Sequence, residues 1–537
     1  TAVRSLRQIL PEEQIIYFGD TARVPYGGRE RETILKYARQ DVRFLRSFDL
    51  KAVVIACGTI STTSLGTLQE ENDLPMVGVV EPACRRALAV SEKKRVGVIA
   101  TLASIRSGAY ERALAKLRPE LQVRAEACPL FVPLVGERFD GHAYIGKSLE
   151  NGAVGTLTDH ELADYRPDKF YVLVPDTLLA LGDLAAYYRS KFDVKIIAVT
   201  GSVGKTTSKD MAAAVLSQKF RVLKTDGNFN NNIGVPKTLF RLSHEHQVAV
   251  VEMGMNHVGE IDYLTRIARP DAAIITNIGD AHIENLGSRE NTLMAKAEVF
   301  HGMKAAGLAI LNGDDPLLRS LDGKLHQSIL WYGENDGNDY QCKSLDERFS
   351  DHMVMETVTP TGTWQQTIPG IGRYMIYPTL AAAAVGQWLG MTQEEIAEGV
   401  GHFVNSKMRM DTVRCGDGVI VLNDTYNANP QSMRAALEVL SKFDGDYKVA
   451  VLGDMLELGD LGPALHESVG QFVVTCGIDC LVAVGTLAEN IYNAAQAGGK
   501  VECYYRPTKE EAKAVLDQVI RKNTIVLCKA SRGMAME

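Results

Sequence analysis

Short hydrophobic runs recur along the chain, and each gives way to polar or small residues. Four nearly continuous runs of Val, Ile, Leu and Ala stand in the middle of the sequence, at 195–200, 247–252, 272–277 and 307–312. Continuous runs of this length are typical of parallel strands that are buried on both faces. The pattern therefore predicts a parallel α/β sheet, which we place in a central domain from 191 to 400.

The same pattern returns in the last quarter of the chain, in runs at 419–423, 448–453, 480–485 and 524–529. These runs predict a second, Rossmann-like α/β domain from 401 to 537. Residues 313–375 show few clear periods, and we expect small strands there whose order the pattern does not predict.

The N-terminal region, 1–135, also has α/β character. Its strand candidates alternate with helical patterns, and these stretches are 29–47, 50–57, 95–101 and 103–117. Between 136 and 190 we expect part of a further domain, with a helix over 176–189 in which Leu178, Leu181, Leu184 and Ala185 share a face. Because no Pro/Gly/Ser-rich spacer occurs near 130–142, the first two regions meet at a joint without a linker.

Composition narrows the class of protein. The net charge is −8 and 46% of residues are hydrophobic, with acidic and basic residues mixed along the chain. This argues against nucleic acid or a membrane surface as the main partner. No apolar run approaches 18 residues, so we expect no membrane insertion. Nine scattered cysteines indicate a reducing cytoplasm, not a disulfide framework.

The stretch 196–207, IIAVTGSVGKTT, has the order that a phosphate-binding loop requires: strand, Gly-rich turn, helix. Gly201 and Gly204 let backbone N–H groups face a phosphate, Lys205 neutralises phosphate charge, and Thr206 reaches Mg²⁺. The full pattern has Gly where Val199 stands, so the match is partial. The plain alternative is a Gly-rich strand–helix turn with a surface lysine.

Each of the four central runs ends in a polar residue, and these are Thr200, Glu252, Asn277 and Asn312. In open α/β sheets, ligands bind beyond the carboxyl ends of the strands, so we expect these residues at one edge. Glu252 is then a candidate Mg²⁺ ligand together with Thr206. Taken alone, Glu252 could equally be a solvated residue at a strand end.

From Gly136 onward the chain resembles the Mur ligases, through GERFDGH (136–142), YNANP (426–430) and GDMLELG (453–459). The resemblance implies an ATP-dependent amide ligase of peptidoglycan precursor synthesis, with a monomeric ligase core. The last two motifs resemble the branch that adds D-Ala-D-Ala to UDP-MurNAc-tripeptide, not those that add L-Ala, D-Glu or the diamino acid. Residues 136–190 then correspond to part of a UDP-substrate-binding domain.

The same resemblance implies roles for individual residues. The expected ATP-binding residues are Gly201, Ser202, Val203, Gly204, Lys205, Thr206, Thr207, Asn277, Asn312, Arg409 and Asp424. The expected substrate contacts are Asn231, Asn232, Asn427 and Asn429. Two Mg²⁺ ions are expected on Thr206, Glu252, His282 and Lys296, with Lys296 carried as a carbamate. The expected catalytic residues are Lys205, Glu252, His282 and Lys296.

The sequence departs from the family pattern at a few positions. Met408 stands where Gly usually precedes the arginine, and Ala530 replaces Gly in a Lys-Gly-Ser-Arg motif. Tyr374 and Pro378 stand where His and Asn are usual. None of these changes removes a residue expected to be catalytic.

The first 135 residues resemble the first half of a glutamate racemase, in the stretches 17–29, 56–62, 78–83 and 97–110. That family uses two cysteines as acid and base on opposite faces of the α-carbon, and Cys57 matches the first. The second lies in a Cys-Thr-His triplet, which this sequence lacks. Because one thiol cannot serve both faces, we interpret Cys57 as a relic site, or as a buried cysteine at a strand end.

Four functions therefore compete. The first is the ligase, and the second is a regulatory nucleotide switch, which the missing Asn-Lys-x-Asp base-reading motif disfavours. The third is a chimera whose ATP core folds but which has neither ligase nor racemase activity. The fourth is a bifunctional racemase–ligase, which the absent second cysteine weakens.

Overall fold

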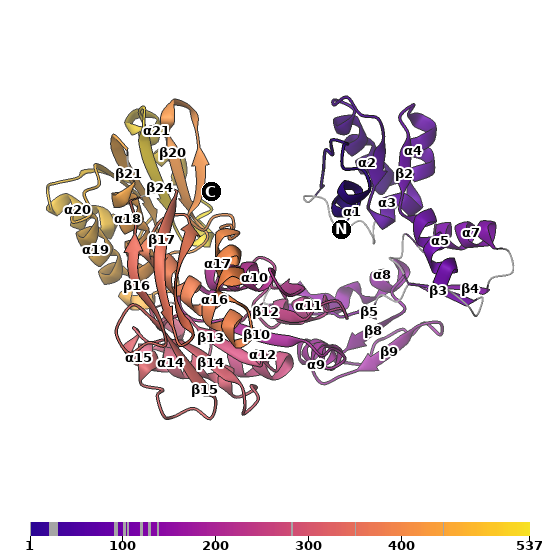
Figure 1. Ribbon diagram of the computed structural model, residues 1–537, viewed down its shortest axis with the longest axis horizontal. Coiled ribbons are helices and arrows are strands. Elements are labelled where there is room, and N and C mark those ends of the chain that lie inside the picture. Colours follow the sequence, from indigo (N-terminus) through magenta and orange to yellow (C-terminus); the bar gives the residue numbers. More distant parts are fainter. Residues whose placement is uncertain are drawn as a thin grey trace. The chain divides into compact units, whose positions relative to one another are not determined.

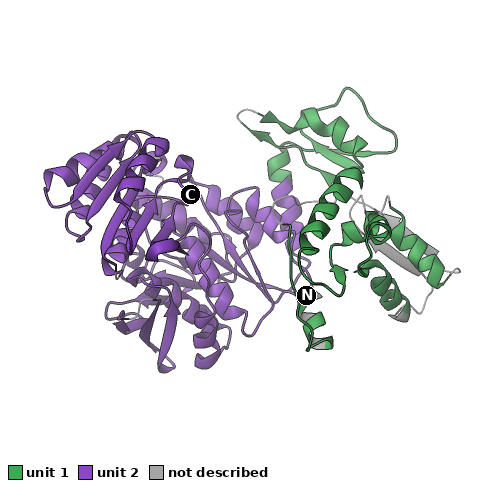
Figure 2. Ribbon diagram, turned by 90° about the horizontal axis from the view of Figure 1, so that it is seen from above, with its two compact units in different colours: residues 1–180 green, residues 181–537 purple. Residues whose placement is uncertain are grey.

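A computed structural model describes residues 2–20, 31–90, 95–99, 104, 107–118, 122–126, 130–136, 139–280, 283–348, 351–443 and 445–537. The chain forms two compact units, Thr1–Ala180 and Leu181–Glu537 (Figures 1 and 2). The boundary falls inside one helix, α9 (Thr177–Arg189). No helix among the described residues is long and apolar enough to cross a bilayer.

The first unit is built from short elements. Its helices are α1 (Ala2–Ile9), α2 (Arg31–Leu45), α3 (Gly58–Thr63), α4 (Leu65–Glu71), α5 (Val80–Val90), α7 (Ala109–Leu117), η1 (Gly141–Tyr144) and α8 (Ile145–Glu150). Its strands are β1 (Val53–Ile55), β2 (Met76–Gly78), β3 (Arg95–Ile99), β4 (Gln122–Glu126), β5 (Leu130–Phe131), β6 (Val135–Gly136), β7 (Phe139–Asp140), β8 (Gly155–Thr158) and β9 (Phe170–Leu173). The α/β character expected for this region is confirmed, although β1 is shorter than the predicted run 50–57.

Small parallel sheets organise this unit. Strands β1 and β2 pair in parallel, as do β3 and β4, and β5, β8 and β9 form a three-stranded parallel sheet. Helix α2 turns Ile34, Ala38 and Val42 towards the first of these sheets, because residues at i, i+4 and i+8 share a helix face. Helix α8 packs Ile145 and Leu149 into a separate small cluster beside Ala153.

The second unit contains a nine-stranded sheet with the order β11-β12-β10-β13-β14-β15-β16-β17-β18 (Figure 1). Its strands are β10 (Lys195–Thr200), β11 (Val222–Lys224), β12 (Val248–Glu252), β13 (Ala272–Ile275), β14 (Leu308–Asn312), β15 (Ser328–Gly333), β16 (Tyr340–Asp346), β17 (His352–Thr359) and β18 (Gly362–Pro369). Pairing is parallel as far as β16 and antiparallel beyond it. Strand β10 lies between β12 and β13, so the strand order reverses there, and such a switch point is where α/β sheets bind ligands.

Helices cover both faces of this sheet. They are α10 (Lys205–Leu216), α11 (Gly234–Leu239), α12 (Glu260–Ala268), α13 (Ile283–Leu286), α14 (Arg289–Ala297), η2 (Glu298–Phe300), α15 (Pro316–Arg319), η3 (Arg373–Met375), α16 (Ile376–Trp388) and α17 (Gln393–Gly401). Ile197 and Val199 pack into a core with α10, α16 and α17, whereas Ile196 and Ala198 pack into the core on the other face. This two-sided burial is the physical reason for the continuous hydrophobic runs.

The C-terminal part of the second unit has its own six-stranded sheet, with the order β19-β20-β24-β21-β22-β23. Its strands are β19 (Asp411–Arg414), β20 (Ile420–Asp424), β21 (Tyr447–Gly453), β22 (Cys480–Val484), β23 (Glu502–Arg506) and β24 (Thr524–Lys529). Its helices are η4 (Gly416–Gly418), α18 (Pro430–Lys442), η5 (Gly459–Leu461), α19 (Gly462–Val473), α20 (Glu489–Ala497), α21 (Lys509–Val519) and η6 (Arg532–Met534). All pairs are parallel except β19 with β20.

Two sequence predictions differ in detail from the structure. The irregular region 313–375 holds β15 to β18, and its last three strands are seven or eight residues long and not small. The helix over 176–189 is present as α9, but Leu184 is exposed, and the buried positions are Thr177, Leu181, Gly182, Ala185 and Arg189. The buried face of α9 therefore follows positions four residues apart, which the predicted positions did not.

Candidate active site

The Gly-rich turn lies between the end of β10 and the start of α10, as predicted. Gly201 and Gly204 have φ values of 142° and 83°, and a Cβ atom on Gly201 would lie 1.9 Å from Thr276 Oγ1. Glycine is therefore required at 201 for both conformation and space. Asn277 fixes the turn, since its Oδ1 accepts a hydrogen bond from the Val203 N–H at 2.9 Å.

Lys205 begins α10 and bends back over the turn. Its Nζ donates to the carbonyl oxygens of Gly201 at 2.8 Å and Ser202 at 3.2 Å. Burial lowers the pKa of Lys205 to about 8, although the Glu252 carboxylate opposes this shift. A bound polyphosphate would favour the ammonium form, because an adjacent negative charge stabilises a cation.

Glu252 ends β12 and is buried. Its Oε1 accepts a hydrogen bond from Asn230 Nδ2 at 2.8 Å, and Lys209 Nζ lies 3.9 Å from Oε2. Oε2 accepts no hydrogen bond from any described residue. The buried hydroxyl of Thr200 and the Nε of Arg409 are likewise without partners among the residues described. Buried polar atoms are normally satisfied, so their concentration around one site indicates that a polar ligand completes it.

Lys296 lies near the end of α14 and is 1% exposed. Burial and the nearby Lys205 lower its pKa well below the ordinary lysine value. Its ammonium has no ion pair with any described carboxylate. A buried lysine in this state favours the neutral amine. His282, the other expected metal ligand, lies outside the described residues.

Two predicted residues reach the site from the C-terminal part of the unit. Arg409 Nη2 lies 3.4 Å from Thr206 Oγ1, and its guanidinium stacks 4.1 Å from the centroid of the Tyr426 ring. Asp424 forms an ion pair with the buried Lys529 at 2.5 Å. Met408 has φ 59°, which explains why glycine is usual at this position in the family that the sequence resembles.

A cavity of about 650 Å³ lies between these two parts of the unit. Its lining includes Val203, Gly204, Thr206, Thr207, Asn277, Asn312, Arg409, Asp424 and Lys529. The structure thus brings most of the expected ATP-binding residues to one concave surface. Cavities of this size, with a few convergent polar groups, are typical small-molecule sites.

The asparagines expected to bind substrate make local backbone contacts. Asn231 Oδ1 accepts from the N–H groups at the start of α11, and Asn429 caps α18 through a hydrogen bond from Ser432 N–H at 2.9 Å. Asn427 Oδ1 accepts from Ala428 N–H. None of these three, nor Asn232, lines the cavity, so their predicted role in substrate binding stays a prediction.

Several residues of the site were not assigned roles from the sequence. One is Lys529, which directly precedes Ala530 in the stretch that resembles the Lys-Gly-Ser-Arg motif. Lys209 sits one helical turn after Lys205, and its Nζ donates to Thr225 O at 3.0 Å. A lysine that continues a phosphate-binding turn into a helix is ordinarily exposed, so only the fold reveals its burial beside Glu252.

Cys57 lies just beyond β1, at the N-cap of α3, and is half-buried. The other described cysteine of the first unit, Cys84, is buried in α5, and burial raises the pKa of its thiol. The relic interpretation of Cys57 therefore stays a prediction.

Comparison with known proteins defines the class. Family models match residues 199–386 (Mur ligase middle domain), 408–532 (Mur ligase, glutamate ligase domain) and 1–140 (Asp/Glu/Hydantoin racemase). The chain belongs to the Mur ligase family and is an ATP-dependent amide ligase with a racemase-like N-terminal region. Both resemblances drawn from the sequence are confirmed.

Individual relatives make the match more specific. The UDP-N-acetylmuramoyl-tripeptide–D-alanyl-D-alanine ligase of Bacillus subtilis is 38% identical over 77% of this chain and 90% of its own length. The enzyme of the same name from Escherichia coli is 37% identical over 76% and 89%. A MurF crystal structure from Acinetobacter baumannii superposes with TM-score 0.70 at 34% identity, covering 76% of this chain and 88% of that one. The MurF ligase of Thermotoga maritima, solved with ADP, gives 0.69 at 28%, covering 76% and 92%.

Proposed function

We propose that the chain joins D-Ala-D-Ala to the terminal carboxylate of UDP-MurNAc-tripeptide in peptidoglycan precursor synthesis. The carboxylate attacks the γ-phosphorus of ATP, ADP leaves, and an acyl phosphate forms. The amine of D-Ala-D-Ala then attacks the acyl carbon, phosphate leaves, and the amine loses a proton. The observation that carries the proposal is the similarity to ligases of this name over nine-tenths of their length, together with the phosphate-binding turn in the cavity.

The chain's own residues divide this work. The Gly-rich turn at 201–204 and the ammonium of Lys205 hold the polyphosphate, so that charge developing on the transferred group is neutralised. Arg409 and the Asp424–Lys529 pair bring the C-terminal part of the unit to the nucleotide. The shared cavity excludes water from the acyl phosphate, which would otherwise hydrolyse.

The donor set around Glu252 fits magnesium. Carboxylate and hydroxyl oxygens are the ligands that Mg²⁺ prefers, and a buried Glu252 oxygen without a hydrogen-bond donor suits a cation. Thr206 and Glu252 would hold one ion, and His282 and Lys296 would contribute to a second. Mg²⁺ supplies positive charge that screens the phosphates from the attacking carboxylate.

Lys296 is suited to carry a carbamate. Its burial beside Lys205 favours the neutral amine, which can add CO₂ and lose a proton to form a carbamate anion. The carbamate places an anionic oxygen ligand near the Lys205 ammonium, so the two groups attract each other, whereas a protonated Lys296 would be a buried cation without an anionic partner among the described residues.

Replacing Lys296 with Ala should lower the rate of amide formation by about 100-fold or more, because a charged group at the reacting phosphates is lost. Added acetate or another short carboxylic acid should restore part of the activity of Lys296→Ala. The same acid should not restore the activity of Lys296→Arg. ¹³C-labelled bicarbonate should give a carbamate signal that Lys296→Ala lacks. The exposed Lys324→Ala is the matched control and should retain both rate and signal. A wild-type protein without the signal would contradict the carbamate.

The wider setting is also a proposal. We place the reaction in the cytoplasm, since all the described cysteines are free thiols, as is usual in reducing compartments. We propose a monomeric ligase core with domains at 191–400 and 401–537, preceded by a partial UDP-binding region at 136–190 and a partial racemase-like region at 1–135. Racemisation is not part of the proposal, because the sequence lacks the second cysteine motif.

Substrate choice tests this function. Purified chain should form a UDP-MurNAc-pentapeptide from UDP-MurNAc-tripeptide and D-Ala-D-Ala, as detected by mass spectrometry. Three reactions serve as matched controls: L-Ala, D-Glu or a diamino acid, each offered with the nucleotide substrate to which its own ligase adds it. None of these reactions should give a product. Amide formation with one of those amino acids in place of D-Ala-D-Ala would assign the chain to a different branch of the family.

A further inference from the structure

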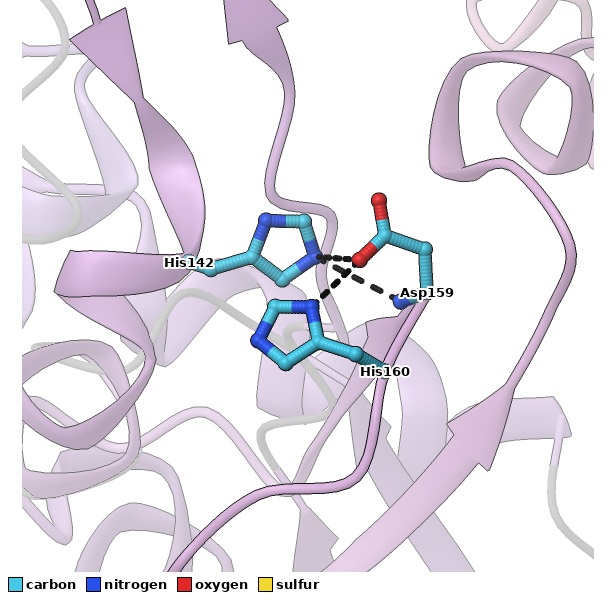
Figure 3. A group of neighbouring side chains, drawn as sticks. All are labelled: His142, Asp159 and His160. Atoms are coloured by element: carbon cyan, nitrogen blue, oxygen red, sulfur yellow. Dashed lines mark hydrogen bonds and ion pairs between the residues drawn. The ribbon is translucent and has the colours of Figure 1, made fainter.

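Three side chains outside the ligase site converge in the first unit (Figure 3). The donor atoms of His142, Asp159 and His160 all lie within 4.8 Å of one another. His142 Nε2 lies 3.2 Å from Asp159 Oδ1, and His160 Nδ1 lies 2.5 Å from the same oxygen. Figure 3 shows both imidazole rings directed at the Asp159 carboxylate.

A fourth residue orients His142. The Oδ1 of Asp140 lies 2.8 Å from His142 Nδ1 and also accepts the His142 backbone N–H at 2.9 Å. A carboxylate on Nδ1 favours the tautomer that carries its proton there, and leaves the Nε2 lone pair directed at Asp159. Metal-binding histidines are held by this kind of carboxylate contact. The protein partner of Nε2 is the Asp159 N–H, at a long 3.4 Å.

The dimensions suit a small divalent ion. Donors about 2.1 Å from a tetrahedral metal are about 3.4 Å apart, and the 3.2 Å between His142 Nε2 and Asp159 Oδ1 is close to this value. His160 Nδ1 lies closer, at the hydrogen-bond distance of 2.5 Å from the same oxygen, and would move outward when an ion binds. His142 is buried, whereas the side chains of Asp159 and His160 are 32% and 55% exposed. The site therefore has a buried inner ligand that Asp140 orients, and two outer ligands that solvent reaches.

We propose that His142, Asp159 and His160 form a binding site for a divalent transition metal, with Zn²⁺ as the best chemical match. Two imidazoles and one carboxylate are a typical zinc donor set, while Mg²⁺ prefers oxygen ligands alone. The ion would bind through His142 Nε2, an Asp159 oxygen and His160 Nδ1.

The position in the fold gives the ion a structural role. His142 belongs to η1, and Asp159 and His160 directly follow β8, so one ion links two segments 17 residues apart. The adjoining core is small, with Ile145, Leu149 and Ala153 as its buried residues. Small domains of this kind gain much of their stability from metals, because binding to the folded form favours folding.

Metal binding by the full-length chain tests the proposal, with Co²⁺ as a spectroscopic probe and Zn²⁺ as its competitor. Excess Mg²⁺ keeps the ligase site occupied. The wild type should show visible Co²⁺ bands without a thiolate charge-transfer band, and Zn²⁺ should displace the ion. His160→Ala should weaken binding by at least about tenfold. Zn²⁺ should also raise the Tm of the wild type, but not that of His160→Ala.

The chain offers a matched control in Asp351 and His352, an adjacent Asp-His pair with Nδ1 2.7 Å from Oδ1. No third described ligand completes a group of three around this pair. His352→Ala should therefore bind Co²⁺ as the wild type does. Because His160 is exposed, its replacement should leave the fold intact, which circular dichroism would verify. Equal binding by His160→Ala and wild type, or a thiolate band, would overturn the site. The experiment measures metal binding and not turnover, so its result is independent of whether the chain is active as a ligase.

Discussion

Lys205→Ala is expected to lower kcat/KM for ATP by about 100- to 1,000-fold. The side chain provides a positive charge at the phosphate-binding turn, and the loss of one such electrostatic group typically has an effect of this size. Its Nζ donates to the carbonyl oxygens of Gly201 and Ser202, which holds the ammonium against the turn that is expected to bind the phosphate. Steady-state phosphate release at varied ATP concentration measures the change.

The pH dependence of ATP binding gives a second readout for Lys205. Its pKa in the free protein is about 8, so above that pH the amine must take up a proton before it can pair with phosphate. The Kd for ATP should be level below pH 8 and rise by about tenfold per pH unit above it. Lys205→Arg should remove this rise. Lys237→Ala, on the exposed side of α11, is the control and should bind ATP normally. An unchanged turnover in Lys205→Ala would exclude the phosphate role.

Glu252→Gln is expected to reduce ligase turnover by about 100-fold or more, and to raise the Mg²⁺ concentration needed for half-maximal rate. The substitution keeps an oxygen that can accept the Asn230 hydrogen bond but removes the negative charge that attracts the cation. It also leaves the buried Lys209 ammonium without one of its nearby carboxylates, so we expect a lower Tm. Titration of Mg²⁺ at saturating ATP separates the metal effect from the stability effect.

Glu245→Gln is the matched control, because Glu245 is exposed and pairs with Arg221 on the surface. It should change neither the Mg²⁺ requirement nor the rate, since exposed ion pairs contribute little. A Glu252→Gln protein that turned over at the wild-type rate with the same Mg²⁺ requirement would remove Glu252 from the metal site.

Much of the sheet architecture could be predicted because burial on both faces leaves a local signature. The runs at 195–200 and 524–529 match β10 and β24 at both ends. The C-terminal ends of the four central runs also predicted the edge of the nine-stranded sheet at which Glu252 and Asn312 lie. In such strands each residue packs against a helix layer, so the hydrophobic run is continuous. The strand can therefore be predicted without knowing which strand it pairs with.

Other features depend on contacts between distant residues. The strands β16 to β18 pair antiparallel, and their alternating burial is set by which strand lies alongside, so their order was not predictable. The ion pair between Asp424 and Lys529 joins residues 105 positions apart. The family resemblance implied substrate contacts for Asn231 and Asn429, and only the structure shows that their side chains accept hydrogen bonds from backbone N–H groups at the starts of α11 and α18.

Phosphate release from ATP, measured with Mg²⁺ and with UDP-MurNAc-tripeptide and D-Ala-D-Ala added singly and together, is the most direct test of the ligase assignment. The account predicts release only when both substrates are present, with one phosphate formed for each amide bond. Nucleotide binding without substrate-dependent release would contradict it, and would leave a chain with a folded ATP core but no ligase activity.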